Sequence, residues 1–271
     1  MNIDDNQPTK FDSMLGRIVV IASHVFREVI RDRVLYLVGL FAILLVGSAG
    51  FLPQVAAGTQ DKILLDIGLA AMGIIGLIVA IFIGTGLVNK EIEKRTVLVL
   101  IAKPVSPAEF IVGKHIGLSA ILAVLLIAMS AIYLLVLLFN QVSFSFLSIL
   151  SAVFFLWLEL SLITAVAILL GVFTSSLIAT LLTFAVYLMG HLSPDIVKLG
   201  RLAKNPTLEI VTQGIYLILP DLSRLDLKNQ AVYGLNLLPD NQTLFLNFIY
   251  GIVYIVLLLA IATIIFSRRQ F

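Results

Sequence analysis

The sequence predicts an all-α polytopic membrane protein with six transmembrane helices, and its composition and long uncharged runs carry this prediction. Hydrophobic residues make up 60% of the 271 residues, charged residues only 13%, and the mean hydropathy is +1.10. A soluble globular domain has about half apolar residues and about a quarter charged residues. A helix satisfies its backbone polar groups within one segment, so it can cross a bilayer. This composition excludes a soluble enzyme, a disordered regulator and a nucleic-acid-binding domain.

Runs of about 20 apolar residues, the length that crosses a hydrocarbon core about 30 Å thick, define the spans. The 46-residue run 147–192 has Glu159 as its only charged residue. It is too long for one crossing, because as a helix it would extend about 69 Å at 1.5 Å per residue. We therefore place a tight hairpin at Gly171 and 174–176, which divides the run into two spans. The six predicted spans are 34–52, 63–88, 116–139, 147–172, 177–192 and 244–266.

Lysine and arginine residues near the span ends are distributed unequally. Twelve lie in the N-terminal segment, the 89–115 loop and the C-terminal tail, and six lie on the other side, most of them in the 193–243 loop. Such an excess is typical of cytoplasmic segments. The sequence therefore predicts that both termini and the 89–115 loop are cytoplasmic and that the 193–243 loop is external.

The segment 14–33, before the first span, has the pattern of an amphipathic helix. Its apolar stripe consists of Leu15, Ile18, Ala22, Val25 and Val29, and its polar stripe of Arg17, His24, Glu28 and Arg31. The spacing of three and four residues predicts a helix with one apolar face. We expect it to lie in the cytoplasmic interface. The alternative is an extension of the first span into the headgroups.

The 89–115 loop is more complex than a connector requires. Dense mixed charge is followed by an apolar patch at 97–102 and a break at Lys103-Pro104. The residues Ser106, Pro107 and Glu109 then match a capping box with proline at the first helical position. We expect a short amphipathic helix, a sharp turn and a new helix that leads into the third span. The loop is thus predicted to present a shaped surface to a cytoplasmic partner.

The 193–243 loop is long and not of low complexity. Asn205-Pro206 begins an apolar segment that ends at Pro220, a more polar stretch covers 221–234, and a turn at 239–241 leads into the last span. We expect short helices that lie on the outer interface or dip into it, and these could form a lid over the external end of a pathway. A solvated loop is the alternative, which the apolar content makes less favourable.

Few residues outside the spans could carry chemistry. The chain has no cysteine and no GxxxxGK[ST] sequence, which excludes thiolate chemistry and ATP hydrolysis by the P-loop route. His24, His115 and His191 lie near the predicted interfaces without ligand-like spacing to carboxylates, so we expect no metal site.

Two acidic residues fall within the predicted spans. Asp66 lies near the outer end of the second span, where it can reach the headgroups, whereas Glu159 lies near the middle of the fourth. A charge at the centre of a span costs about 2.5–3.5 kcal/mol on insertion scales and usually faces the protein interior or water. Two roles stay open for Glu159: a structural one, protonated and hydrogen-bonded between helices, and one in a transport pathway.

Three short motifs stand between the second and third spans. They are Glu-Ile-Glu-Lys-Arg-Thr at 91–96, Lys-Pro-Val-Ser-Pro at 103–107 and Glu-Phe-Ile-Val-Gly-Lys at 109–114. Together with the helix before the first span, they resemble the transmembrane subunits of ABC type-2 exporters, although Arg95 stands where that family often has glycine. The segment 219–229 is similar to the outer loop of the branch that contains the nitrous-oxide-reductase maturation permease.

The resemblance implies a non-catalytic permease subunit, forming one domain over 1–271, in a prokaryotic cytoplasmic membrane. It implies pairing with a second permease copy or homologue and with two separate ATP-binding subunits, which bind ATP and magnesium, so that this chain has no cofactor. It further implies that the 89–115 loop supplies a coupling helix. The expected coupling residues are Glu91, Glu93, Lys94, Arg95, Leu98, Leu100, Pro104, Ser106 and Glu109.

An autonomous membrane protein is the alternative to a permease subunit. It could be a secondary transporter with Glu159 as a proton site, or a membrane-embedded enzyme. Two similar halves of inverted topology would favour a secondary transporter. The sequence shows no such repeat.

Overall fold

The computed structural model describes residues 10–31, 34–56, 58–93, 106–202 and 206–268, and within these ranges the secondary structure is helical, without strands. The α-helices are α1 (Lys10–Arg31), α2 (Tyr36–Val55), α3 (Gln60–Glu93), α5 (Pro107–Phe139), α6 (Phe146–Phe173), α7 (Ser176–Leu202), α8 (Pro206–Ile218), α9 (Lys228–Val232) and α10 (Asn241–Arg268). Two short 3-10 helices, η1 (Leu222–Arg224) and η2 (Leu235–Leu237), flank α9.

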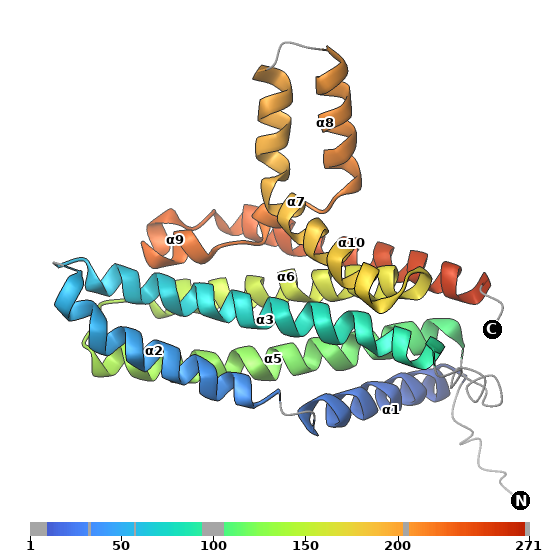
Figure 1. Ribbon diagram of the computed structural model, residues 1–271, viewed down its shortest axis with the longest axis horizontal. Coiled ribbons are helices and arrows are strands. Elements are labelled where there is room, and N and C mark those ends of the chain that lie inside the picture. Colours follow the sequence, from blue (N-terminus) through green and yellow to red (C-terminus); the bar gives the residue numbers. More distant parts are fainter. Residues whose placement is uncertain (1–9, 32–33, 57, 94–105, 203–205, 269–271) are drawn as a thin grey trace, which may run out of the picture.

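Six of these helices are long and apolar enough to cross a membrane: α2, α3, α5, α6, α7 and α10. This confirms the predicted all-α polytopic fold class. The bundle has two ends (Figure 1). We call the end with the α2–α3 turn the Gly58 end, and the end where α3 stops and α5 begins the Ser106 end. The C-terminus lies at the Ser106 end.

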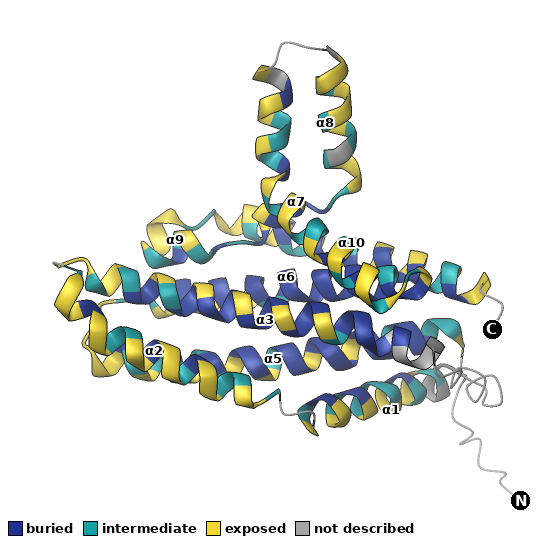
Figure 2. Cartoon of the chain, viewed as in Figure 1, coloured by how far each residue is buried: buried dark blue, intermediate teal, exposed yellow. Residues whose placement is uncertain are grey.

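The central helix of the bundle is α6. It packs against α3, α5, α7, α9 and α10, and Figure 2 shows most of α6 and α3 as buried. A helix that is apolar all round is expected to be enclosed in this way. Close approach of α3 and α6 depends on Gly84, where an added Cβ would lie 2.9 Å from the Cβ of Ala167. Small residues allow such close packing between membrane helices.

Several helices extend beyond the predicted spans. The second span continues as a helix to Glu93, the third begins as a helix at Pro107, and both therefore protrude at the Ser106 end. The turn predicted between the fourth and fifth spans is confirmed at Thr174 and Ser175, whereas Gly171 lies within α6. There it faces Thr85, whose carbonyl oxygen would be 3.3 Å from an added Cβ.

The predicted start of the outer loop at residue 193 is wrong, because α7 continues through Pro194 to Leu202. A proline lacks the N–H that would bond the carbonyl four residues earlier, here that of Gly190. The Ser193 hydroxyl donates to this carbonyl at 3.1 Å and so replaces the missing donor. Beyond this point α7 and α8 form an antiparallel pair that projects from the bundle (Figure 1). The helix expected after Asn205-Pro206 is confirmed as α8.

Candidate functional sites

The first turn of α5 is closed by a complete capping box. The Glu109 backbone N–H donates to Ser106 Oγ at 3.2 Å, and the Ser106 N–H donates to Glu109 Oε2 at 2.8 Å. Pro107 occupies the start of the helix, where its missing N–H is not needed. The predicted helix start is confirmed in both position and chemistry.

The same carboxylate binds α1. Arg17 Nη2 donates to Glu109 Oε1 at 2.6 Å, and Arg17 Nε lies 3.1 Å from both carboxylate oxygens. The Glu109 side chain is only 3% exposed. Hydrogen bonding to Glu109 raises the pKa of Arg17, which therefore stays charged. A guanidinium that meets a carboxylate through two nitrogens fixes orientation as well as distance. We call Arg17, Ser106 and Glu109 the α1–α5 joint.

Apolar packing continues the α1–α5 joint along both helices. Ile18, Val25 and Val29 are buried, as expected for the apolar stripe, whereas Leu15 is exposed. At Gly117 of α5 an added Cβ would lie 2.8 Å from the carbonyl oxygen of Ala22. α1 is therefore fastened directly to α5. Its position at the cytoplasmic interface stays a prediction.

A second group of charged residues surrounds Glu159 in the middle of α6. The Glu159 side chain is 1% exposed, with His191 Nε2 3.3 Å from Oε1 and Lys228 Nζ 4.0 Å from Oε2. Asp226 joins them, since its Oδ1 is 3.4 Å from Lys228 Nζ and its Oδ2 is 3.7 Å from His191 Nε2. We call these four residues the Glu159 cluster. It links α6, α7 and the segment around α9.

Lys228 is the main counter-charge in the Glu159 cluster. Its Nζ is 3.4 Å from the position of a Cβ on Gly73, so the absence of a side chain on α3 makes room for the ammonium group. Burial opposes the charge of Lys228, but the Glu159 and Asp226 carboxylates outweigh it and raise the pKa of Lys228. A buried carboxylate needs such a partner, because an isolated charge in a low-dielectric interior is unfavourable by several kcal/mol.

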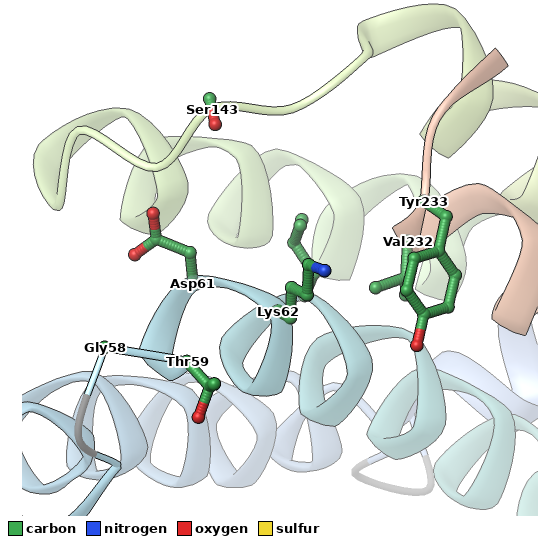
Figure 3. A pocket seen from close by; sticks show the side chains of 8 residues that line it. Gly58, Thr59, Asp61, Lys62, Ser143, Val232 and Tyr233 are labelled. Atoms are coloured by element: carbon green, nitrogen blue, oxygen red, sulfur yellow. The ribbon is translucent and has the colours of Figure 1, made fainter. Parts of the chain in front are cut away.

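A cavity of about 450 Å³ opens at the Gly58 end (Figure 3). Its lining comes from the α2–α3 turn, the start of α3, the α5–α6 connection and the end of α9: Gly58, Thr59, Asp61, Lys62, Leu65, Ser143, Val232 and Tyr233. Lys62 Nζ lies 5.2 Å from the centre of the Tyr233 ring, a cation–π distance. The polar stretch predicted at 221–234 thus folds against the bundle, and its last residues line this cavity.

Comparison with known families decides what kind of protein carries these sites. The family model described as ABC-2 family transporter protein matches residues 19–271. The chain belongs to the ABC-2 transporter family. This ABC-2 protein is a membrane component of a transporter, and its six apolar helices make it a multi-pass membrane protein. A comparison with curated proteins gives no match.

The structure of this ABC-2 protein places some of the predicted coupling residues and not others. Lys94, Arg95, Leu98, Leu100 and Pro104 lie outside the described residues. Glu91 and Glu93 belong to the last turn of α3. Ser106 and Glu109 are brought together with Arg17, a partner that the sequence interpretation missed.

The two acidic residues of the predicted pathway lie in different surroundings. Asp66 is exposed, near the Gly58 end of α3, and is not part of the Glu159 cluster. Glu159 has His191, Asp226 and Lys228 as partners, none of which the sequence interpretation assigned to it. His191, expected near an interface, lies 3.3 Å from the Glu159 carboxylate. No group of three His, Asp or Glu residues suited to a metal ion occurs in the described part of the chain.

Proposed function

We propose that this chain is the permease subunit of an ATP-driven exporter, which pairs with a second copy or a homologue in a prokaryotic cytoplasmic membrane and in which two separate ATP-binding subunits hydrolyse ATP. Membership of the ABC-2 family supports the transport role. The distribution of Lys and Arg supports a cytoplasmic Ser106 end with both termini on that side. The motif at 219–229 supports a relationship to the nitrous-oxide-reductase maturation branch.

The proposed coupling role of the 89–115 loop is supported mainly by the contacts of the α1–α5 joint. Ser106 of this loop caps α5, and the Glu109 carboxylate connects the first turn of α5 both to Ser106 and to α1. A displacement of the loop by an ATP-binding subunit would therefore move α1 and α5 together. Since α5 packs on α6, the displacement would continue into the bundle. A ligand that favours one of two packings in this way shifts the population between them.

Substitutions in the apolar patch of the loop test this proposal. Apolar side chains in pockets anchor a docked helix, whereas charges at the rim mainly affect the association rate. We expect the double variant Leu98→Asp/Leu100→Asp to lose the ATP-binding subunit during co-purification. Lys94→Ala is the matched control, with a mild, salt-dependent effect. No predicted span is changed in either variant, so both should still insert into the membrane.

Co-purification distinguishes docking of the ATP-binding subunit on this loop from docking elsewhere. Normal recovery of an active ATP-binding subunit with the double aspartate variant would contradict docking through this loop.

Labelling of single cysteines with an impermeant reagent tests the orientation of the chain in the membrane. Each introduced cysteine is the only one that can react, because the natural chain has no cysteine. In intact cells a cysteine at Asn229 should react and one at Lys103 should not. Reaction at position 103 from outside would contradict the proposed topology.

A further inference from the structure

Glu159 is a buried carboxylate that is paired by charge but not by hydrogen bonds. Neither of its oxygens has a hydrogen-bond partner among the described residues, and neither has the Nε2 atom of His191. The distances of 3.3 Å to His191 Nε2 and 4.0 Å to Lys228 Nζ are those of loose ion contacts. A buried polar group left without hydrogen bonds is unfavourable by about 1–3 kcal/mol, and by more if it is charged. The Glu159 cluster is therefore poised to exchange one partner for another.

The orientation of His191 defines what its Nε2 atom can do. His191 Nδ1 lies 3.0 Å from the Tyr187 carbonyl oxygen. A carbonyl oxygen only accepts, so Nδ1 carries a hydrogen and donates it. Nε2 then either holds a second proton or presents a lone pair to the carboxylate. Lone pairs of a neutral Nε2 and an ionised Oε1 would repel each other, so a proton between these two atoms makes their contact favourable.

Exposure changes in steps across the Glu159 cluster. The side chains of Asp226 and His191 are 20% and 23% exposed, whereas Glu159 is 1% exposed. His191 thus has contact with solvent on one side and with Glu159 on the other. Lys228 and Asp226 belong to the segment 221–232, which rests on the bundle through short elements only, η1 and the five-residue helix α9. A movement of this segment away from α6 would expose residues of the segment that are buried: Leu222, Leu225, Leu227 and Ala231.

We propose that Glu159 is a proton-binding site, and that a proton passed on by His191 replaces the Lys228 ammonium when the segment 221–232 moves away from α6. Lys228 leaves together with Asp226 as an ion pair, and the proton that binds Oε1 takes the place of the ammonium group at Glu159. His191 gives its Nε2 proton to Oε1 and regains one from water at its exposed side. Without this proton transfer, Glu159 would stay ionised in the interior with His191 as its remaining cationic partner, and a buried group avoids the ionised state by protonation.

The titratable groups that face Glu159 are consistent with this exchange. They are His191 and Tyr187 on α7, Asp226, which precedes α9, and Lys228 on α9. α3 contributes Gly73, which has no side chain. In the described part of the chain, Lys228 and His191 are therefore the cationic groups within 4.0 Å of Glu159. When the segment lifts, Lys228 and Asp226 leave together and His191 stays.

Infrared spectroscopy of the purified chain in lipid discs tests the proposal, because protonated and ionised carboxyl groups absorb at different frequencies. The signal of Glu159 is obtained by subtracting the spectrum of Glu159→Gln. We expect no protonated Glu159 at neutral pH in the natural protein or in the control Lys198→Met, since Lys198 is an exposed lysine paired with Asp195. We expect a protonated Glu159 in Lys228→Met. If Lys228→Met is poorly folded, Lys228→Met/Glu159→Gln should recover its folding.

The role of His191 is tested by the rate of proton uptake after a rapid drop in pH. In the Lys228→Met background, His191→Gln should slow protonation of Glu159 by about 100-fold, since a positioned proton donor contributes at least this factor. Protonated Glu159 in the natural protein at neutral pH, or no protonation in Lys228→Met, would overturn the proposal. An unchanged uptake rate in His191→Gln would overturn the relay. None of these measurements involves an ATP-binding subunit. A result that overturns the proton site would therefore leave the proposed function untouched.

Discussion

Two buried glutamates on neighbouring helices of this protein have opposite surroundings. Glu109 accepts hydrogen bonds of 2.6–3.1 Å from Arg17 and one of 2.8 Å from the Ser106 backbone. Glu159 has ion contacts of 3.3 and 4.0 Å and no hydrogen-bond partner for either oxygen in the described residues. The two side chains are almost equally buried, at 3% and 1% exposure.

The difference concerns what each carboxylate can do during a conformational change. A fully hydrogen-bonded buried network makes its surroundings rigid, whereas a partly satisfied one does not. The α1–α5 joint is therefore suited to transmit movement without changing shape. The Glu159 cluster is suited to exchange partners, since Glu159 is held by charge without hydrogen bonds from the described residues, and two residues of the cluster, Asp226 and Lys228, lie on the segment 221–232. Burial alone would not distinguish the two sites.

The largest expected effect follows from removing the counter-charge of Glu159. Breaking a buried pair from one side costs about 3–5 kcal/mol, so Lys228→Met should lower the free energy of unfolding by up to this amount at neutral pH. The loss should shrink at lower pH, because the folded variant already holds Glu159 protonated and the unfolded chain gains the same proton only in acid. Denaturant unfolding in detergent at two pH values measures it. A loss that is the same at both values would contradict the role given to Glu159.

The next effect comes from the α1–α5 joint. Gly117→Ala places a methyl group against the Ala22 carbonyl oxygen, and overpacking of this kind costs about 1–3 kcal/mol. This loss should not depend on pH, in contrast to that of Lys228→Met. The same unfolding experiment measures it, and Gly214→Ala serves as a control because nothing lies within 4 Å of the added Cβ. A clear pH dependence for Gly117→Ala would remove the distinction between the two sites.

Loss of the cap has a smaller effect. Ser106→Ala removes the acceptor for the Glu109 N–H, a change that costs about 1 kcal/mol at a helix N-terminus. Glu109→Gln keeps a side chain that suits a capping box but loses the charge that binds Arg17. If the ion pair fastens α1, Glu109→Gln should increase proteolysis of α1 in the folded protein and Ser106→Ala should not. Equal proteolysis of both variants would show that Arg17 adds nothing to the joint.

The smallest effect is expected at Asp240, which lies away from both glutamates and serves as a reference for the effect of acid on stability. Asp240 accepts from the N–H and hydroxyl of Thr243 at the start of α10, and these hydrogen bonds lower the pKa of Asp240. A carboxylate with a lowered pKa stabilises the fold above its unfolded pKa of about 3.9, and this is lost as the pH falls. Asp240→Asn should therefore be slightly less stable than the natural protein at neutral pH and lose less stability in acid, so that the two converge. Identical acid unfolding curves would contradict this.

Local patterns predicted much of this structure, because the interactions concerned lie within one or two turns of helix. Ser106 and Glu109 are three residues apart, and the capping box follows from their spacing alone. The six apolar runs likewise predicted the spans, although the fifth was ended too early, before Pro194. A helical turn that carries charge and extends beyond a span has the same hydropathy as a loop. Hydropathy therefore does not show where such a helix ends.

The partners of both glutamates depended on tertiary structure. Arg17 is 92 residues from Glu109, and no local pattern connects them. The contact between His191 and Glu159 could have been predicted from the sequence. The two residues lie almost equally far along the chain from the turn at Thr174, and an antiparallel helical hairpin places such residues side by side. Ending the span at residue 192 hid this, since His191 then seemed to lie at the interface. Lys228 and Asp226 reach Glu159 through a non-repetitive segment that periodicity does not place.

The reaction rates of two buried cysteines test the contrast between the sites most directly. Ala231→Cys lies on the buried face of α9 and Ile111→Cys beside the α1–α5 joint, at natural exposures of 4% and 0%. The rates of both with a maleimide, divided by that of the exposed Ser143→Cys, are measured on the purified protein as the pH is lowered. The relative rate at position 231 should rise as Glu159 gains its proton, while that at position 111 stays low. Equal rates at all pH values, or an earlier rise at position 111, would contradict a fixed joint and a cluster that opens.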